Sequence, residues 1–207
     1  MLSFIPRSPM KAILLTLPVL LLSSCVDYST AGGGGSTTGY LAAFRHSAPI
    51  QKGLPHEQGF WDAEGITGSP SIVIRRTEQK AYFYKGNHIV GMSPVATGKT
   101  THTTPGGRFK VTQKSKDHKS SLYGVIRDDA TGAIVNDDAD TRKHKPKAGQ
   151  TFENAPMPYF MRFNGGIGMH VGHLPGYAAS HGCVRMPEDM AIKFFENAEL
   201  GTPVIVE

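Results

Sequence analysis

The stretch GMHVGHLPGYAASHGCVRMP, residues 168–187, holds three of the nine histidines and one of the two cysteines of this 207-residue chain. Cysteine is a strong nucleophile near neutral pH only as a thiolate, so it needs a base or a positive charge beside it. A histidine next to Cys183 would remove the thiol proton and return it to the leaving group. Gly182 permits close backbone approach, and the amides around Gly182 and Cys183 are candidate oxyanion donors. The stretch therefore predicts nucleophilic catalysis by Cys183.

The residues around this stretch predict a mainly β domain. Short runs rich in β-branched and aromatic residues alternate with turn residues, and the sequence Lys85-Gly86-Asn87 predicts a hairpin. The predicted strands cover residues 72–74, 81–84, 88–95, 109–111, 159–163, 167–170 and 202–206.

One helix is predicted directly after the cysteine motif. Pro187 fits the first helical position, acidic residues follow it in the first turn, and Gly201 fits the end. Five apolar residues then share one face of this helix, which indicates packing on a core. They are Met190, Ala191, Phe194, Phe195 and Ala198.

Residues 114–147 differ in pattern from the rest of the domain, because charges of both signs alternate there without apolar periodicity. Such a pattern predicts a solvated loop, and long loops in compact domains are often lids over a site. A lid at the substrate rim and a plain surface insertion both remain open.

The N-terminus is typical of an exported protein. Arg7 and Lys11 precede an apolar run over residues 12–22, and small residues follow before Cys25. No apolar run in the chain reaches the roughly 18 residues that a spanning helix needs. Four glycines at residues 32–35 predict a flexible tether. We expect a signal peptide at 1–24, a lipidated Cys25 with tether and lead-in to residue 65, and a catalytic domain over 66–207.

The sequence Ser180-His181-Gly182-Cys183-Val184-Arg185, with His170 upstream, resembles the [ST]-H-G-C-x-[RN] signature of the L,D-transpeptidase (YkuD-type) catalytic domain. Residues 94–99 and 104–109 also resemble that family's strand-and-turn pattern, so the resemblance covers residues 71–206. It implies a mixed β-sandwich or barrel with one packed α-helix after the catalytic loop. It also implies an enzyme that acts on peptidoglycan stem peptides without a cofactor.

The resemblance assigns roles to residues by position. Cys183 is the nucleophile that attacks the diamino-acid carbonyl and releases D-Ala, His170 is the base, and the backbone carbonyl of Val171 orients the imidazole. His181 and Arg185 line the site, although His181 could equally brace the loop and Arg185 could pair with Glu188 or Asp189. Ser180 is expected to hydrogen-bond the loop rather than to react. The acyl group passes to an amine, which gives a 3–3 cross-link or attaches an envelope protein; with water as acceptor, the same intermediate makes a hydrolase.

The sequence Leu22-Ser23-Ser24-Cys25 resembles the lipobox of bacterial lipoproteins, which implies lipidation of Cys25. Two or three acyl chains hold a protein stably on a membrane where one does not. Val26 rather than an aspartate after the cysteine favours the outer membrane in a Gram-negative host. We therefore expect a lipid-anchored enzyme of the cell envelope that faces the periplasm; an ordinary cleaved signal is the alternative.

Other chemistries have weaker support. His170, His173, His181 and Cys183 could bind zinc, but their spacing is unlike structural zinc sites, and no metal or other cofactor is expected. A non-catalytic envelope lipoprotein is a further alternative. Residues 93–100 resemble a phosphate-binding loop, yet its first glycine is Ser93. The net charge is +5, but the basic residues do not alternate with aromatic residues on any one predicted element, so no nucleic-acid partner is expected.

Overall fold

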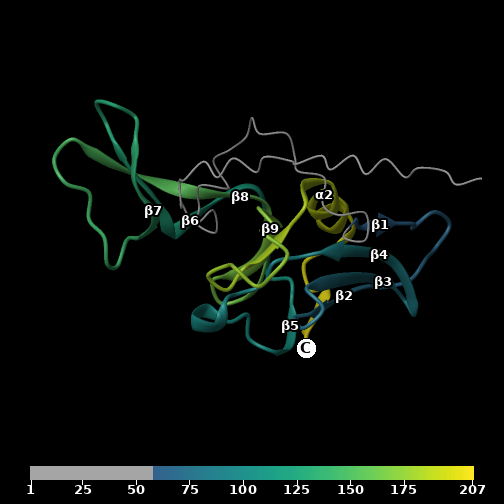
Figure 1. Ribbon diagram of the computed structural model, residues 1–207. Coiled ribbons are helices and arrows are strands. Elements are labelled where there is room, and N and C mark those ends of the chain that lie inside the picture. Colours follow the sequence, from purple (N-terminus) through teal and green to yellow (C-terminus); the bar gives the residue numbers. More distant parts are fainter. Residues whose placement is uncertain (1–57) are drawn as a thin grey trace, which may run out of the picture. The chain divides into compact units, whose positions relative to one another are not determined.

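Two β-sheets and one α-helix make up residues 58–207, which are the residues that the computed structural model of this chain describes (Figure 1). This confirms the mainly β fold with a helix after the cysteine motif. The predicted signal peptide, the lipidation of Cys25 and the glycine tether lie outside the described residues. No helix within residues 58–207 has the length and apolar character to cross a membrane.

The first sheet has six strands in the order β1-β4-β3-β2-β11-β5. Its centre is an antiparallel meander, and the C-terminal strand β11 adds to β2 in parallel. Gly86, at φ 58°, turns the hairpin predicted at residues 85–87. The strands are β1 (Phe60–Trp61), β2 (Pro70–Arg75), β3 (Lys80–Lys85), β4 (His88–Pro94), β5 (Gly107–Lys110) and β11 (Pro203–Val206).

The second sheet has five strands in the order β10-β9-β8-β6-β7. All its pairs are antiparallel except β9 with β10, which run parallel. Its strands are β6 (Gln113–Asp128), β7 (Ile134–Asp140), β8 (Gln150–Asn164), β9 (Ile167–Val171) and β10 (Val184–Met186). A short 3-10 helix, η2 (Thr100–His102), lies between β4 and β5.

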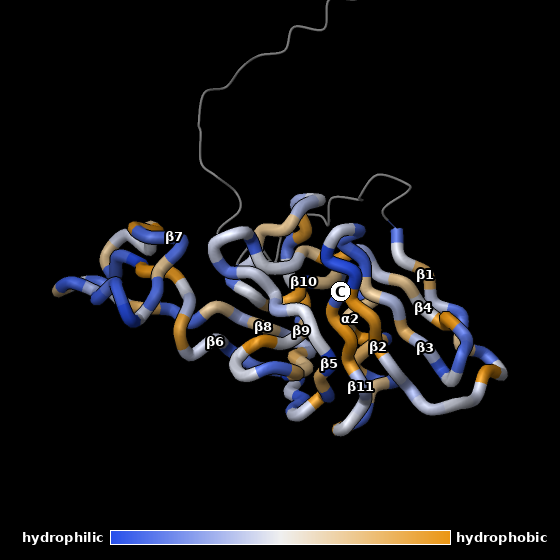
Figure 2. Tube along the Cα trace, turned by 90° about the horizontal axis from the view of Figure 1, so that it is seen from below, coloured by the Kyte–Doolittle hydropathy of each residue, from blue (hydrophilic) through white to orange (hydrophobic). Residues whose placement is uncertain are grey.

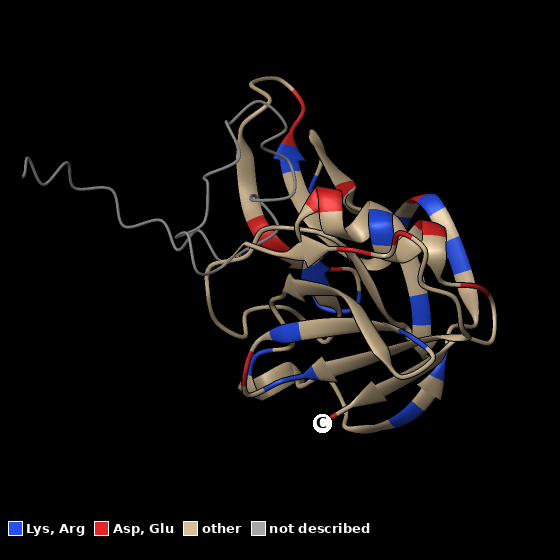
Figure 3. Ribbon diagram, turned by 90° about the vertical axis from the view of Figure 1, so that its right-hand side faces the viewer, with Lys and Arg blue, Asp and Glu red and all other residues tan. Residues whose placement is uncertain are grey.

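The helix α2 (Glu188–Asn197) packs its predicted apolar face into the core. Pro187 is the residue before the helix rather than its first residue, and the helix ends before the predicted stop at Gly201. Its charged residues lie on the outer face (Figure 3), while apolar residues gather along β2 and β11 in the middle of the domain (Figure 2). Burial of this one face therefore fixes the helix against the sheets.

The interpretation of residues 114–147 as a loop is wrong, because β6 and β7 form a hairpin there that extends β8 and projects from the domain (Figure 1). Backbone pairing with β8 supports the hairpin while most side chains stay in contact with water, so no apolar alternation marks the strands. Pro156 and Pro158 also lie in β8, where this strand pairs with β6 alone among the described strands. Proline is tolerated at such an edge.

The short strand β1 lies within the stretch predicted as a lead-in. Phe60 and Trp61 pair with β4 opposite Met92 and Gly91. The Trp61 ring lies 5.2 Å from the ring of Phe83 and 5.9 Å from that of Phe194. The strand therefore covers one end of the core.

Trp61→Ala should lower the free energy of unfolding by about 2–3 kcal/mol, because it leaves a cavity beside Phe83 and Phe194. Phe60→Ala is the matched control, since Phe60 is adjacent but 47% exposed and should change stability by less than about 1 kcal/mol. Urea denaturation followed by circular dichroism measures both. Equal, small losses would show that β1 does not belong to the folded domain.

Candidate active site

The pairing of β9 with β10 brings the predicted nucleophile and base together. Val184 pairs with Met169 and Arg185 with His170, so Cys183, immediately before β10, lies beside the strand that carries His170. The Cys183 side chain is partly buried, and its Sγ lies 3.9 Å from the carbonyl oxygen of Gly166. Residues that are 13 positions apart in the chain thus become neighbours on adjacent strands.

His170 is held as a neutral base. Its Nδ1 lies 2.8 Å from the backbone oxygen of Val171, and because a carbonyl only accepts, this nitrogen carries the proton. Burial lowers the pKa of His170 to about 4; the carbonyl of Val171 opposes the shift, and the charges of Arg185 and His118 add to it. At neutral pH the lone pair on Nε2 is therefore available to take a proton.

Cys183 rests as a thiol. Burial raises its pKa above the ordinary value, against a backbone hydrogen bond from Gly168 and the positive charges of Arg185 and Arg162. A neutral thiol beside a neutral imidazole needs no separated charges in the resting site. The arrangement therefore suits proton transfer that accompanies attack on a substrate rather than a permanent thiolate.

Two hydroxyl groups hold the loop that carries Cys183. Ser180 Oγ donates a short hydrogen bond to the carbonyl of Cys183 and accepts one from the Gly182 amide at 3.1 Å. Thr104 Oγ1 donates to the Gly182 carbonyl at 2.8 Å and accepts from the Gly98 amide at 2.9 Å. Gly182 lies at φ 113°, which favours glycine. The Gly182 amide thus braces the loop, which leaves the Cys183 amide as the candidate oxyanion donor.

Residues 95–98 form a strut between the two sheets and this loop. The backbones of Ala96 and Arg185 exchange two hydrogen bonds of 3.0 Å, and the Thr97 carbonyl accepts from the Ser180 amide at 3.0 Å. Gln79 holds the strut in turn, since its side-chain oxygen accepts from the Thr97 amide at 2.9 Å. The stretch that resembles the family's strand pattern at 94–99 therefore supports the loop directly.

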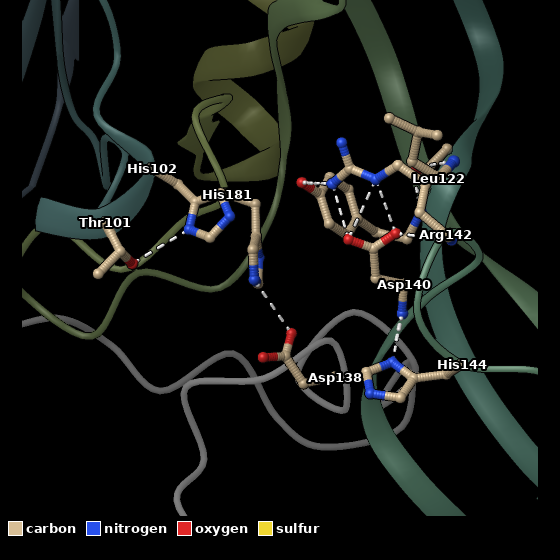
Figure 4. Close-up of polar contacts among 10 residues, drawn as sticks. Thr101, His102, Leu122, Asp138, Asp140, Arg142, His144 and His181 are labelled. Atoms are coloured by element: carbon tan, nitrogen blue, oxygen red, sulfur yellow. Dashed lines mark hydrogen bonds and ion pairs between the residues drawn. The ribbon is translucent and has the colours of Figure 1, made fainter.

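Arg185 and His181 occupy different sides of the loop. Arg185 is buried beside His170, and Gly172 leaves room for its stem, since a Cβ at 172 would lie 2.9 Å from Arg185 Cγ. His181 instead contacts the projecting hairpin, with Nε2 3.2 Å from Asp138 Oδ1 (Figure 4). His181 thus links the catalytic loop to a part of the chain that we expected to be a loop.

The zinc alternative gains no support from the geometry. Within residues 58–207, no three His, Cys, Asp or Glu side chains converge as they must to hold a metal ion. His170 and Cys183 share a site, whereas His181 faces Asp138.

Four residues that the structure places in or beside the site were not assigned to it from the sequence. Thr104 lies in the stretch at residues 104–109 that resembles the family's strand-and-turn pattern, but no role was predicted for its hydroxyl, which donates to the Gly182 carbonyl. His118, Tyr123 and Asp138 lie in the segment predicted as a loop, and its lack of apolar period hid their placement near His170 and His181.

The fold and this site define a class: a two-sheet domain that presents a cysteine beside a neutral, carbonyl-oriented histidine. A model of the L,D-transpeptidase catalytic domain family, YkuD, matches residues 69–206, and the chain belongs to this family. The Bacillus subtilis (strain 168) protein YqjB, whose name places it among the L,D-transpeptidases, is 27% identical over 145 residues, which cover 68% of this chain and 73% of YqjB.

Solved structures are similar as well. A crystal structure of an L,D-transpeptidase from Xylanimonas cellulosilytica has a TM-score of 0.50 at 19% identity, over 69% of this chain and 62% of that chain. The catalytic domain of an Enterococcus faecium L,D-transpeptidase acylated by ertapenem has a TM-score of 0.47 at 25% identity, over 69% of this chain and all of that chain (100%). The chain thus spans less than two thirds of the Xylanimonas structure.

The histidine pKa predicts how stability depends on pH. The pKa of His170 is about 4 when folded, against the ordinary 6.5, so the unfolded chain binds the proton more tightly. Its contribution is therefore complete above pH 6.5 and is lost as the pH falls towards 4. Between pH 7 and pH 5 the parent protein should lose about 2 kcal/mol more stability than the His170→Gln variant. Urea titrations at both pH values measure this, and equal losses would contradict a buried neutral His170.

Proposed function

We propose that this chain is a peptidoglycan L,D-transpeptidase in which Cys183 is the nucleophile and His170 the general base. The observation that carries the proposal is the parallel register of β9 and β10, which sets Cys183 beside a histidine whose Nδ1 proton is already held by Val171. The membership of residues 69–206 in the L,D-transpeptidase catalytic domain family supports the substrate class.

In the acylation step, the sulfur of Cys183 attacks the carbonyl of the diamino acid at the third position of a stem peptide. The thiol proton moves to Nε2 of His170, and the Cys183 amide stabilises the oxyanion. The carbon–nitrogen bond then breaks, His170 returns the proton to the leaving amine, and D-Ala departs. A thioester on Cys183 remains.

In the second step, an amine of another stem peptide attacks this thioester. Neutral His170 takes a proton from the amine, and the sulfur of Cys183 leaves and recovers a proton from His170. The product is a 3–3 cross-link, or an attached envelope protein where the amine belongs to one. Arg185 is proposed to support both steps, because its buried charge lies close to the reacting groups and offsets part of the rise that burial causes in the pKa of Cys183.

Cys183→Ala should abolish acylation while leaving the fold intact, since the side chain carries the chemistry and little of the core. The probe is ertapenem, which acylates an Enterococcus faecium relative. Intact mass spectrometry should show an ertapenem adduct on the parent protein and none on the variant, with equal melting temperatures. An adduct on a folded Cys183→Ala protein would refute Cys183 as the nucleophile.

We also propose that Cys25 carries a lipid that anchors the enzyme in the cell envelope. The lipobox-like Leu22-Ser23-Ser24-Cys25 after a charged and apolar leader supports this. In a bacterial host fed an alkyne-labelled fatty acid, the parent protein should become labelled and Cys25→Ser should not. Cys183→Ser is the matched control and should keep the label; a label that survives Cys25→Ser would contradict the anchor.

A further inference from the structure

The hairpin of β6 and β7 contacts His181, which lies two residues before the proposed nucleophile Cys183. From β7, the Asp138 carboxylate reaches Nε2 of His181 at 3.2 Å. From β6, the Tyr123 ring stacks on the imidazole, with centroids 4.7 Å apart and an interplanar angle of 30°. His181 keeps only 9% of its side chain exposed, whereas Asp138 keeps 45%, so the imidazole is shielded from water and the carboxylate is partly exposed. Two strands of one hairpin therefore contact a single side chain of the catalytic loop, and Figure 4 shows the contact from Asp138.

The hairpin side of this contact is held by its own hydrogen bonds. Two guanidinium nitrogens of Arg142 donate to the Asp140 carboxylate, Nη2 at 2.7 Å and Nε at 2.9 Å. Nη2 also donates to the Tyr123 hydroxyl at 3.0 Å. The Asp140 amide donates to Nδ1 of His144 at 3.0 Å. Such bidentate pairs fix geometry as well as adding energy. The hydrogen bond from Arg142 thus holds the Tyr123 ring that stacks on His181.

Lys99 and η2 also contact the pair formed by His181 and Asp138. The His102 ring meets the His181 ring edge to face at 4.8 Å. Lys99 places its Nζ 3.9 Å from the second carboxylate oxygen of Asp138. The hydrogen bond from His181, with the nearby charges of Lys99 and His102, holds the pKa of Asp138 below its usual range. Asp138 is therefore a carboxylate that links the hairpin both to His181 of the catalytic loop and to Lys99, the residue before η2.

We propose that Asp138 is a positioning residue that acts through His181: it docks the β6–β7 hairpin on the catalytic loop, so that the hairpin forms one wall of the stem-peptide site beside Cys183. This inference rests on the proposed function for the identity of the peptide. The docking itself rests only on the contacts of Asp138, Tyr123 and His181. It gives the projecting hairpin a role in holding substrate rather than in the chemistry of the thiol.

Asp138→Asn tests the docking, because the side chain keeps its size and loses its charge. Asp137→Asn is the matched control: it removes the same charge from the neighbouring residue of β7, while the ion pairs with His181 and Lys99 belong to Asp138. In the full chain, KM for a disaccharide-tetrapeptide should rise about three- to tenfold in Asp138→Asn, since the lost hydrogen bond is charged but its carboxylate is partly exposed. The control should match the parent protein. Asp138→Glu should recover part of the loss.

Two readouts separate positioning from general damage. Alkylation of Cys183 by iodoacetamide should stay within about twofold of the parent rate, because the thiol and His170 are untouched. Deuterium uptake of residues 120–140 should increase in Asp138→Asn alone, because the hairpin loses its attachment. Equal KM values in the two aspartate variants, or a Cys183 that no longer reacts with iodoacetamide, would overturn the positioning role.

The two proposals fail in different ways. If the parent protein does not turn over the tetrapeptide, the proposed function is wrong, while deuterium exchange and alkylation still test the docking. If the tetrapeptide is processed but deuterium uptake is the same in Asp138→Asn and Asp137→Asn, the docking is wrong and the proposed function stands.

Discussion

The parallel pairing of β9 with β10 is the constraint on which the site depends. A parallel pair needs a crossover, and here the chain uses residues 172–183 for it, which become the loop that carries the cysteine. The same register puts Arg185 opposite His170 and buries both. Everything that holds this loop, from Ser180 and Thr104 to the strut at residues 95–98, keeps Cys183 at the start of β10.

Burial gives the site its electrostatic character. It disfavours both the imidazolium of His170 and the thiolate of Cys183, so the resting pair is uncharged. The Val171 carbonyl then decides which imidazole nitrogen carries the proton. In the proposed reaction, charge develops only when Cys183 attacks a substrate carbonyl, and the adjacent positive charge of Arg185 favours this step. A site of this kind keeps the resting thiol less reactive than a permanent thiolate would be.

Much of this could be predicted from the sequence. The strands at residues 72–95 and the helix face with Phe194 were predictable because one side of each is buried and local turn residues mark their ends. The hairpin at residues 113–140 was not, because its strands are held by backbone pairing with β8 and leave no apolar period. The motif is local in the sequence and therefore predicts Cys183 and His170. The contact of Asp138 with His181 joins distant parts of the chain and depends on tertiary structure alone.

The most direct test of the central claim is time-resolved intact mass spectrometry of the protein mixed with a disaccharide-tetrapeptide, with the adduct mapped by peptide fragmentation. The account predicts a transient acyl group on the peptide that contains Cys183, stoichiometric release of D-Ala, and tetrapeptide–tripeptide dimers as the product. Free tripeptide in place of dimers would make the enzyme a hydrolase with the same intermediate. Turnover without any adduct on Cys183, or an adduct mapped elsewhere, would contradict the account.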